Sequence, residues 1–144
     1  MLKNLEDKFN LFCNSENLEI NQSQIKVISK LQDYYQKNFK LSFFNFFFKK
    51  KLKKGFYLYG GVGVGKTMIL DFFFNNIDVK KQRLHFNEFM LNFHNFVHQN
   101  KNKNEQNIIN LFVKNLKLNA SLIYFDEFQV NNIVDAMILG KLFE

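Results

Sequence analysis

Apolar side chains recur three or four positions apart in several stretches of this chain, which is the spacing of one helix face. The clearest case follows the polar run 21–24, which can cap a helix, and it predicts an amphipathic helix over 24–38. The apolar run 68–74 is long enough, with the two residues before it, for a helix over 66–75. The periodic positions are Ile25, Ile28, Leu31 and Tyr35 for the first helix, Phe89, Phe93, Phe96 and Val97 for a helix over 88–99, Ile108, Phe112 and Leu116 for another, and Val134, Ile138 and Leu142 for a last helix that starts near Asn131 and Asn132.

Three short segments predict strands instead. Residues 56–59 are apolar and aromatic, which suits a buried strand, and residues 83–86 are interpreted as a second strand. Residues 122–125 are apolar and lead into two acids, which is typical of a buried parallel strand covered by helices on both faces. Strands that alternate with helices predict an α/β fold with a parallel sheet. Residues 1–20 show no clear periodicity, and no element is predicted there.

Length and composition narrow the class of protein. A chain of 144 residues that is 47% hydrophobic can bury one core, so a single domain is expected. With Cys13 as its one cysteine it cannot form an internal disulfide, and this fits a reducing compartment such as the cytoplasm. No run of eighteen apolar residues occurs, which argues against a membrane span, and the first ten residues lack the apolar core of a secretory signal.

The net charge of +7 would ordinarily suggest a nucleic-acid or membrane partner. Here Arg83 stands against nineteen lysines, and twenty phenylalanines occur with no proline or tryptophan, so the bias resembles a genome-wide codon preference. The phenylalanine-rich run 41–48 leads into a basic run at 49–54. We interpret these as a docked segment and a solvated turn, and an electrostatic grip on nucleic acid or lipid headgroups stays open as the alternative.

Candidate chemistry begins at residues 60–67, GGVGVGKT, which match G-x-x-x-x-G-K-[ST] at every fixed position. The predicted strand before them and helix after them give the strand–loop–helix context of a phosphate-binding loop. Glycines let the backbone approach phosphates, Lys66 would reach the β- and γ-phosphates, and the Thr67 hydroxyl would contact Mg²⁺. The predicted nucleotide-binding residues are Gly60, Gly61, Val62, Gly63, Val64, Gly65, Lys66, Thr67 and Met68.

Asp126 and Glu127 are predicted to complete the site. An acid at the carboxyl end of a core strand faces the crevice where α/β sheets bind ligands. Asp126 would hold Mg²⁺ together with Thr67, and Glu127 would act with Lys66 in catalysis by polarising the attacking water. No Asn-Lys-x-Asp guanine reader occurs, so ATP is the expected nucleotide. His94 and His98 have a metal-ligand spacing but lack a third ligand, and we interpret them as a surface or hydrogen-bonded pair.

Three segments, 55–74, 83–98 and 122–144, resemble the ZapE family of AAA+ ATPases, and DEFQV followed by DAMILGKLF is the most diagnostic block. The likeness runs from about residue 20 to residue 144. Two positions depart from the family: Val64 replaces a frequent Arg, and Asn87 replaces the second His of an H-F-H-x-F-M block. The resemblance implies a partial AAA+ nucleotide-binding domain over 55–144, behind a helical extension over 21–54.

The resemblance also implies an oligomeric ATPase that remodels a protein partner, in bacteria near the division machinery. The chain ends 18 residues after Asp126, before the sensor strand, arginine finger and helical lid of AAA+ proteins. Because the sensor strand lies between the two core strands in that family, residues 1–144 alone are expected to leave unpaired strand edges, to fold poorly and to be catalytically silent. A nucleotide-binding DNA factor similar to helicase loaders and a non-catalytic fragment stay open as alternatives.

Overall fold

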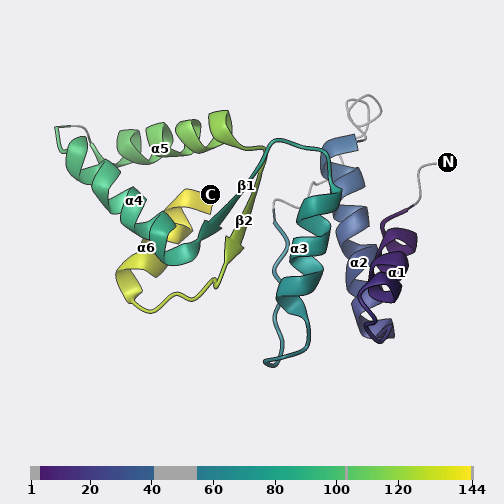
Figure 1. Ribbon diagram of the computed structural model, residues 1–144. Helices are drawn as coiled ribbons and strands as arrows, with labels where there is room; N and C mark the ends of the chain where they lie inside the picture. Colours follow the sequence, from purple (N-terminus) through teal and green to yellow (C-terminus); the bar gives the residue numbers. More distant parts are fainter. Residues whose placement is uncertain (1–3, 41–54, 103, 144) are drawn as a thin grey trace. The chain divides into compact units, whose positions relative to one another are not determined.

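The computed structural model describes residues 4–40, 55–102 and 104–143 (Figure 1). The chain divides into two compact units, Met1–Asp78 and Val79–Glu144, which are described separately. The phenylalanine-rich run 41–48 and the basic run 49–54 lie outside the described residues.

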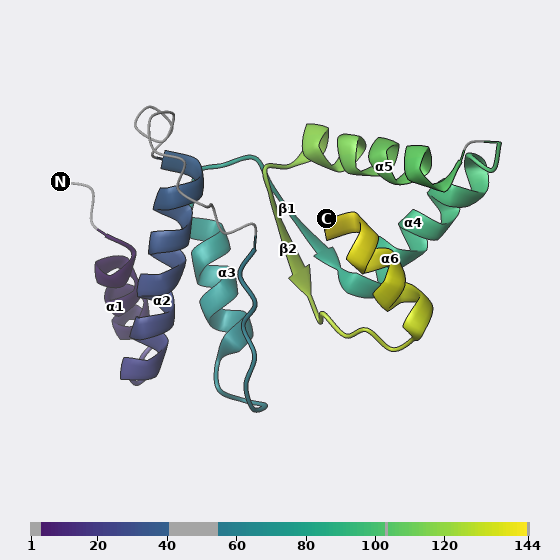
Figure 2. The same cartoon turned by 180° about the vertical axis from the view of Figure 1, so that it is seen from behind.

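Helices make up the regular structure of the first unit. They are α1 (Leu5–Ser15), α2 (Gln22–Tyr35) with a π-helical turn η1 (Gln36–Lys40) directly after it, and α3 (Lys66–Asn76). Figures 1 and 2 show α1, α2 and α3 side by side. Asn21 caps α2 because its side chain accepts a hydrogen bond from the Ser23 N–H at 2.8 Å. The predicted helices over 24–38 and 66–75 are confirmed.

Helix α1 was not predicted, yet it supplies much of the core of this unit. Phe9 and Cys13 have no exposed surface, and Leu5 is buried one turn before them. The Phe9 ring meets the Phe72 ring of α3 edge to face, with centroids 5.0 Å apart. The Leu5 N–H also donates to the Gln32 side chain of α2 at 2.6 Å. The three helices therefore share one apolar core.

The strand predicted at 56–59 is wrong, because residues 55–60 form neither helix nor strand. A strand requires a hydrogen-bonding neighbour, and the sheet in the described part of the chain pairs only β1 (Lys81–His85) with β2 (Leu122–Asp126). Tyr57 and Tyr59 are 68% and 80% exposed, and their rings stack on each other at 6.1 Å. Aromatic character alone therefore did not make this segment a buried strand.

The second unit is built on the parallel pair β1 and β2. Along the chain, α4 (Phe86–Gln99) and α5 (Glu105–Asn119) connect the two strands, and α6 (Ile133–Phe143) follows β2. In both views the three helices lie together beside the strands (Figures 1 and 2). Strand β1 ends at His85 and α4 begins at the next residue, earlier than predicted, because Phe86 turns into the core and is 1% exposed. The shared apolar cluster comprises Phe86, Phe89, Met90, Phe93, Ile109, Phe112 and Leu139.

The parallel pairing is confirmed, but the expected burial of β2 on both faces is wrong for the described residues. Every residue of β2 is only half-buried. A pair of strands with its helices gathered to one side leaves part of each strand uncovered. The last helix starts as predicted, because the Asn132 side chain accepts from the Asp135 N–H at 2.8 Å. None of the described helices has the length and apolar character needed to cross a bilayer.

The burial of Cys13 predicts a protected thiol. Burial raises the pKa of this thiol above its usual value, so the reactive thiolate is scarcer in the folded chain. We expect Cys13 to react with a soluble thiol reagent at least about tenfold more slowly in buffer than in urea, since an opening that costs about 1.4 kcal/mol already gives that factor. Mass spectrometry of the labelled protein measures the reaction rate of Cys13, and the Cys13→Ser variant is the negative control. Equal rates in both solvents would show that α1 does not dock.

Candidate functional site

The glycine-rich loop has a backbone that other residues would adopt only with strain. Gly63 and Gly65 have φ angles of 79° and 82°, in the left-handed region. A Cβ at Gly63 would meet nothing within 4 Å, so this glycine serves the backbone conformation and leaves open space beside it. Gly60, Gly61, Val62, Gly63 and Val64 are all exposed. The main chain of the loop is therefore open to an approaching molecule.

Helix α3 begins at this loop without a side-chain cap. Its N-cap is Gly65, which has no side chain to accept a hydrogen bond, and no acidic residue lies in its first turn. The first N–H groups of a helix point out of its N-terminus and carry the positive end of the helix dipole. Such a terminus attracts anions, above all phosphate. The residues present thus fit the phosphate groups of a nucleotide.

The Lys66 side chain lies back over the loop. Its Nζ donates to the carbonyl oxygens of Gly60 and Gly61, at 3.1 and 2.5 Å. The ammonium is thereby held beside the same peptide groups that would surround a phosphate. Thr67 follows with an exposed side chain, while Met68 is half-buried. All nine residues predicted to bind nucleotide belong to one continuous segment of the first unit.

The acidic pair lies in the second unit, at the end of β2. The Asp126 side chain is 16% exposed, and its Oδ2 lies 2.5 Å from Nη2 of Arg83 on β1. The Arg83 guanidinium also stacks 5.1 Å from the centre of the Tyr124 ring, which is its register partner. This role of Arg83 was not predicted from the sequence. The available signal was a single arginine among nineteen lysines, at the start of the strand predicted over 83–86.

Glu127 is exposed and has an unusual backbone for a residue with a side chain. Its φ is 51°, in the left-handed region that costs such residues about 1–2 kcal/mol. The strand ends immediately before it, and the chain turns away there. Strained backbone of this kind is frequent where a side chain must be aimed for a task.

A metal at this site would need ligands that the protein alone does not gather. Among the described residues no three His, Cys, Asp or Glu side chains lie close enough to hold a metal ion. At Asp126, Mg²⁺ would therefore need water and phosphate oxygens as further ligands, which is how Mg²⁺ usually binds. Of the histidines considered above, His94 has a partner: its Nε2 lies 3.2 Å from Asp135 Oδ1.

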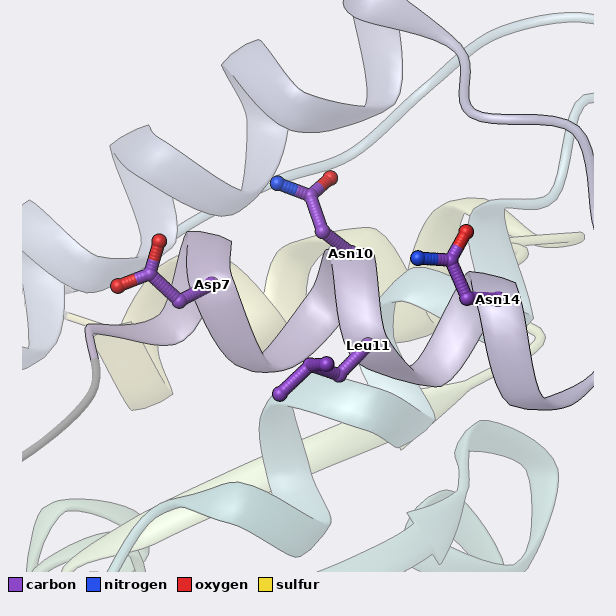
Figure 3. A pocket seen from close by; sticks show the side chains of 4 residues that line it. All are labelled: Asp7, Asn10, Leu11 and Asn14. Carbon is purple, nitrogen blue, oxygen red and sulfur yellow. The ribbon is translucent and has the colours of Figure 1, made fainter.

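The chain also has an open pocket of about 300 Å³ away from the glycine loop. Asp7, Asn10, Leu11 and Asn14 line it, all on α1 (Figure 3). Leu11 is 51% exposed, and the labelled side chains are spread along α1 without converging on one point. This pocket therefore does not compete with the glycine loop as a functional site.

Comparisons with known proteins identify relatives of this chain. A family model described as AFG1-like ATPase matches residues 8–144. Lactation elevated protein 1 homolog B of Danio rerio is 42% identical over 101 residues, which cover 63% of this chain and 20% of the relative. Cell division protein ZapE of Escherichia coli is 38% identical over 90 residues, which cover 62% of this chain and 24% of the relative. No solved structure matches the chain.

The matched part thus spans about a fifth to a quarter of the length of these relatives. The family model nevertheless runs through both units and includes the glycine loop, Lys66, Asp126 and Glu127. The chain belongs to the AFG1-like ATPase family.

Proposed function

We propose that this chain binds ATP with Mg²⁺ and contributes to the hydrolysis of ATP. The observation that carries the proposal is the loop before α3. It combines left-handed glycines, a helix start without a side-chain cap, and an ammonium held over the loop carbonyls. Membership of an ATPase family supports the same nucleotide chemistry.

Binding would rest on three sets of groups. The N–H groups of the loop and of the first turn of α3 donate to phosphate oxygens. Lys66 Nζ exchanges its hydrogen bonds with the Gly60 and Gly61 carbonyls for stronger ones to the β- and γ-phosphates. The Thr67 hydroxyl and the Asp126 carboxylate would be the protein ligands of Mg²⁺, which would supply positive charge to neutralise the phosphates.

Glu127 is proposed as the general base. Its carboxylate accepts a proton from the water that attacks the γ-phosphorus, while the bond from that phosphorus to the β,γ-bridging oxygen breaks and leaves ADP. The exposed position of Glu127 lets a water reach it. Strand β2 ends at Asp126 and the backbone of Glu127 is left-handed, so the two adjacent acids have different backbone settings and can take different roles.

Arg83 adds a competing interaction to this scheme. Its guanidinium already occupies one oxygen of the carboxylate proposed to hold Mg²⁺. Metal and arginine both carry positive charge, so binding of one at Asp126 weakens binding of the other. We therefore propose that Arg83 keeps Asp126 neutralised and oriented until Mg-ATP is bound.

The action of the whole protein is proposed from its relatives. One relative is named as a cell division protein, and ATPases of the AAA+ class work as oligomers on protein partners. We propose that the complete protein assembles with copies of itself and remodels a protein partner. The chain spans only part of these relatives, so this proposal rests on family membership.

Lys66→Ala is predicted to abolish measurable Mg-ATP binding. The variant loses charged hydrogen bonds to phosphate, each worth about 1.5–3 kcal/mol, so two of them give a loss of about 100-fold or more. Titration calorimetry or a fluorescent ATP analogue measures the affinity. Lys30→Ala, which removes an exposed lysine of α2, is the matched control and should bind as the parent does. If Lys66→Ala bound Mg-ATP with the affinity of the parent, the assignment of the glycine-rich loop as the nucleotide-binding site would be wrong.

Glu127→Gln is predicted to retain ATP and lose its hydrolysis in any version of the protein that turns over ATP. The amide keeps the shape of the side chain but cannot accept the proton, and general-base catalysis contributes about 10²–10⁴ in rate. Phosphate release at saturating Mg-ATP measures the effect. Glu88→Gln, an exposed acid at the start of α4, controls for loss of charge. Release at the parental rate would exclude Glu127 as the base.

Arg83→Met is predicted to lower the Mg²⁺ concentration needed for half-maximal ATP binding. The substitution removes the charge that competes for Asp126, and a partly exposed pair of about 0.2–1 kcal/mol allows a shift of up to about fivefold. Arg83→Lys retains the charge and should retain most of the Mg²⁺ requirement. A raised or unchanged Mg²⁺ requirement in Arg83→Met would contradict the competition.

A further inference from the structure

A side chain of the helical extension touches the glycine loop inside the first unit. Gln24 lies in the first turn of α2, and its Nε2 donates to the carbonyl oxygen of Val64 at 3.2 Å. The Gln24 main chain is fixed by the helix start, since its N–H donates to the Asn21 carbonyl at 3.0 Å. The amide therefore reaches the loop from a rigid element, across forty residues of sequence.

Gln24 also occupies the space beside Gly65. A Cβ built on Gly65 would lie 2.8 Å from Gln24 Nε2 and 3.4 Å from Met68 Cε. A glycine is thus needed at position 65 for two reasons: the backbone has a left-handed φ of 82°, and a Cβ would clash with the Gln24 side chain. Close packing on the last loop residue limits how far that residue can move.

The acceptor end of the Gln24 amide destabilises the folded chain. Gln24 Oε1 is buried and finds no hydrogen-bond partner in the described part of the chain. A buried acceptor without a partner costs about 1–3 kcal/mol. Leucine or methionine would fill a similar volume without that cost, so packing alone does not explain an amide here. The donor end, which is bonded to Val64, is the group that an apolar side chain cannot supply.

The bond at Val64 also orients the next N–H group. The carbonyl of Val64 and the N–H of Gly65 belong to one planar, trans peptide, so the two bonds point in opposite directions. When Gln24 holds the carbonyl toward α2, the Gly65 N–H must point to the opposite side of the loop. Hydrogen-bond donors that are fixed in advance bind an anion more tightly than donors that must first reorient.

We propose that Gln24 is a positioning residue for phosphate binding, through which helix α2 holds the Val64–Gly65 peptide and sets the affinity of the loop for polyphosphates. The inference rests on the proposed function and adds a residue to it. The contact is made to the backbone of Val64, so it does not depend on which side chain stands at position 64.

Gln24→Met and Gln24→Glu test the inference against Gln22→Met, an exposed glutamine two residues earlier on the same helix. Methionine removes the donor, and glutamate places only acceptors near the Val64 carbonyl. A lost hydrogen bond of about 0.5–1.5 kcal/mol predicts a 2- to 13-fold rise in Kd for Gln24→Met and a larger rise for Gln24→Glu. Gln22→Met should bind as the parent does.

Two ligands and one ligand-free measurement make the outcome decisive. The affinities for Mg-ATP and for inorganic tripolyphosphate should fall by the same factor, because the loop binds the phosphates of both ligands. Without ligand, hydrogen exchange measured by mass spectrometry should be faster in peptides covering 60–68 and unchanged in peptides covering α1, which belongs to the same unit. The α1 peptides also verify that this unit is folded in each variant, and Gln24→Glu provides a second variant if Gln24→Met is not.

Three other results would contradict either the role of Gln24 or the proposed function. Weaker Mg-ATP binding with unchanged tripolyphosphate binding would place Gln24 at the base or sugar and refute the positioning role. Unchanged affinity and unchanged exchange in both variants, in a parent that binds ATP and loses it in Lys66→Ala, would refute the role of Gln24 alone. A parent that binds neither ligand would refute the proposed function, and the inference with it.

Discussion

The candidate site depends first on the backbone at Gly65. A helix whose opening N–H groups are to meet an anion must begin without a side chain that caps them, and the chain must turn sharply just before it. Gly65 meets both requirements, with a φ of 82° and no side-chain oxygen. The position of Lys66 follows, because the next residue starts α3 with its ammonium over the loop carbonyls. A side chain at position 65 would strain the turn and displace Gln24.

In the second unit the corresponding constraint is the register of two parallel strands. Pairing of Arg83 with Tyr124 and of His85 with Asp126 puts the guanidinium within reach of both an aromatic ring and a carboxylate. A slip of one residue would move every side chain of a strand to the opposite face. The phenylalanine cluster of α4 and α5 opposes such a slip, because Phe89 packs edge to face on Phe125 of β2 at 4.8 Å.

The sequence was informative where the determining pattern is local. Periodic apolar positions predicted four helices, α2 and α4 to α6, the apolar run 68–74 predicted α3, and the loop motif located the glycines. Helix α1 was missed because its buried residues form one narrow stripe among polar neighbours. The strand at 56–59 failed because strand formation depends on a partner, which composition does not specify. Arg83 and Gln24 were missed because their contacts span 43 and 40 residues, and only the folded chain brings such positions together.

The tie between Gln24 and a main-chain carbonyl has a consequence for how this loop can diverge among related proteins. Every amino acid carries the same carbonyl, so position 64 can accept new side chains while the contact persists. The side chain of Val64 is 52% exposed, so a different side chain can be accommodated there. Positions 24 and 65 lack this freedom, since an amide of the right length and a residue without a Cβ are needed together. We therefore expect position 64 to change freely among related proteins, and positions 24 and 65 to change only together.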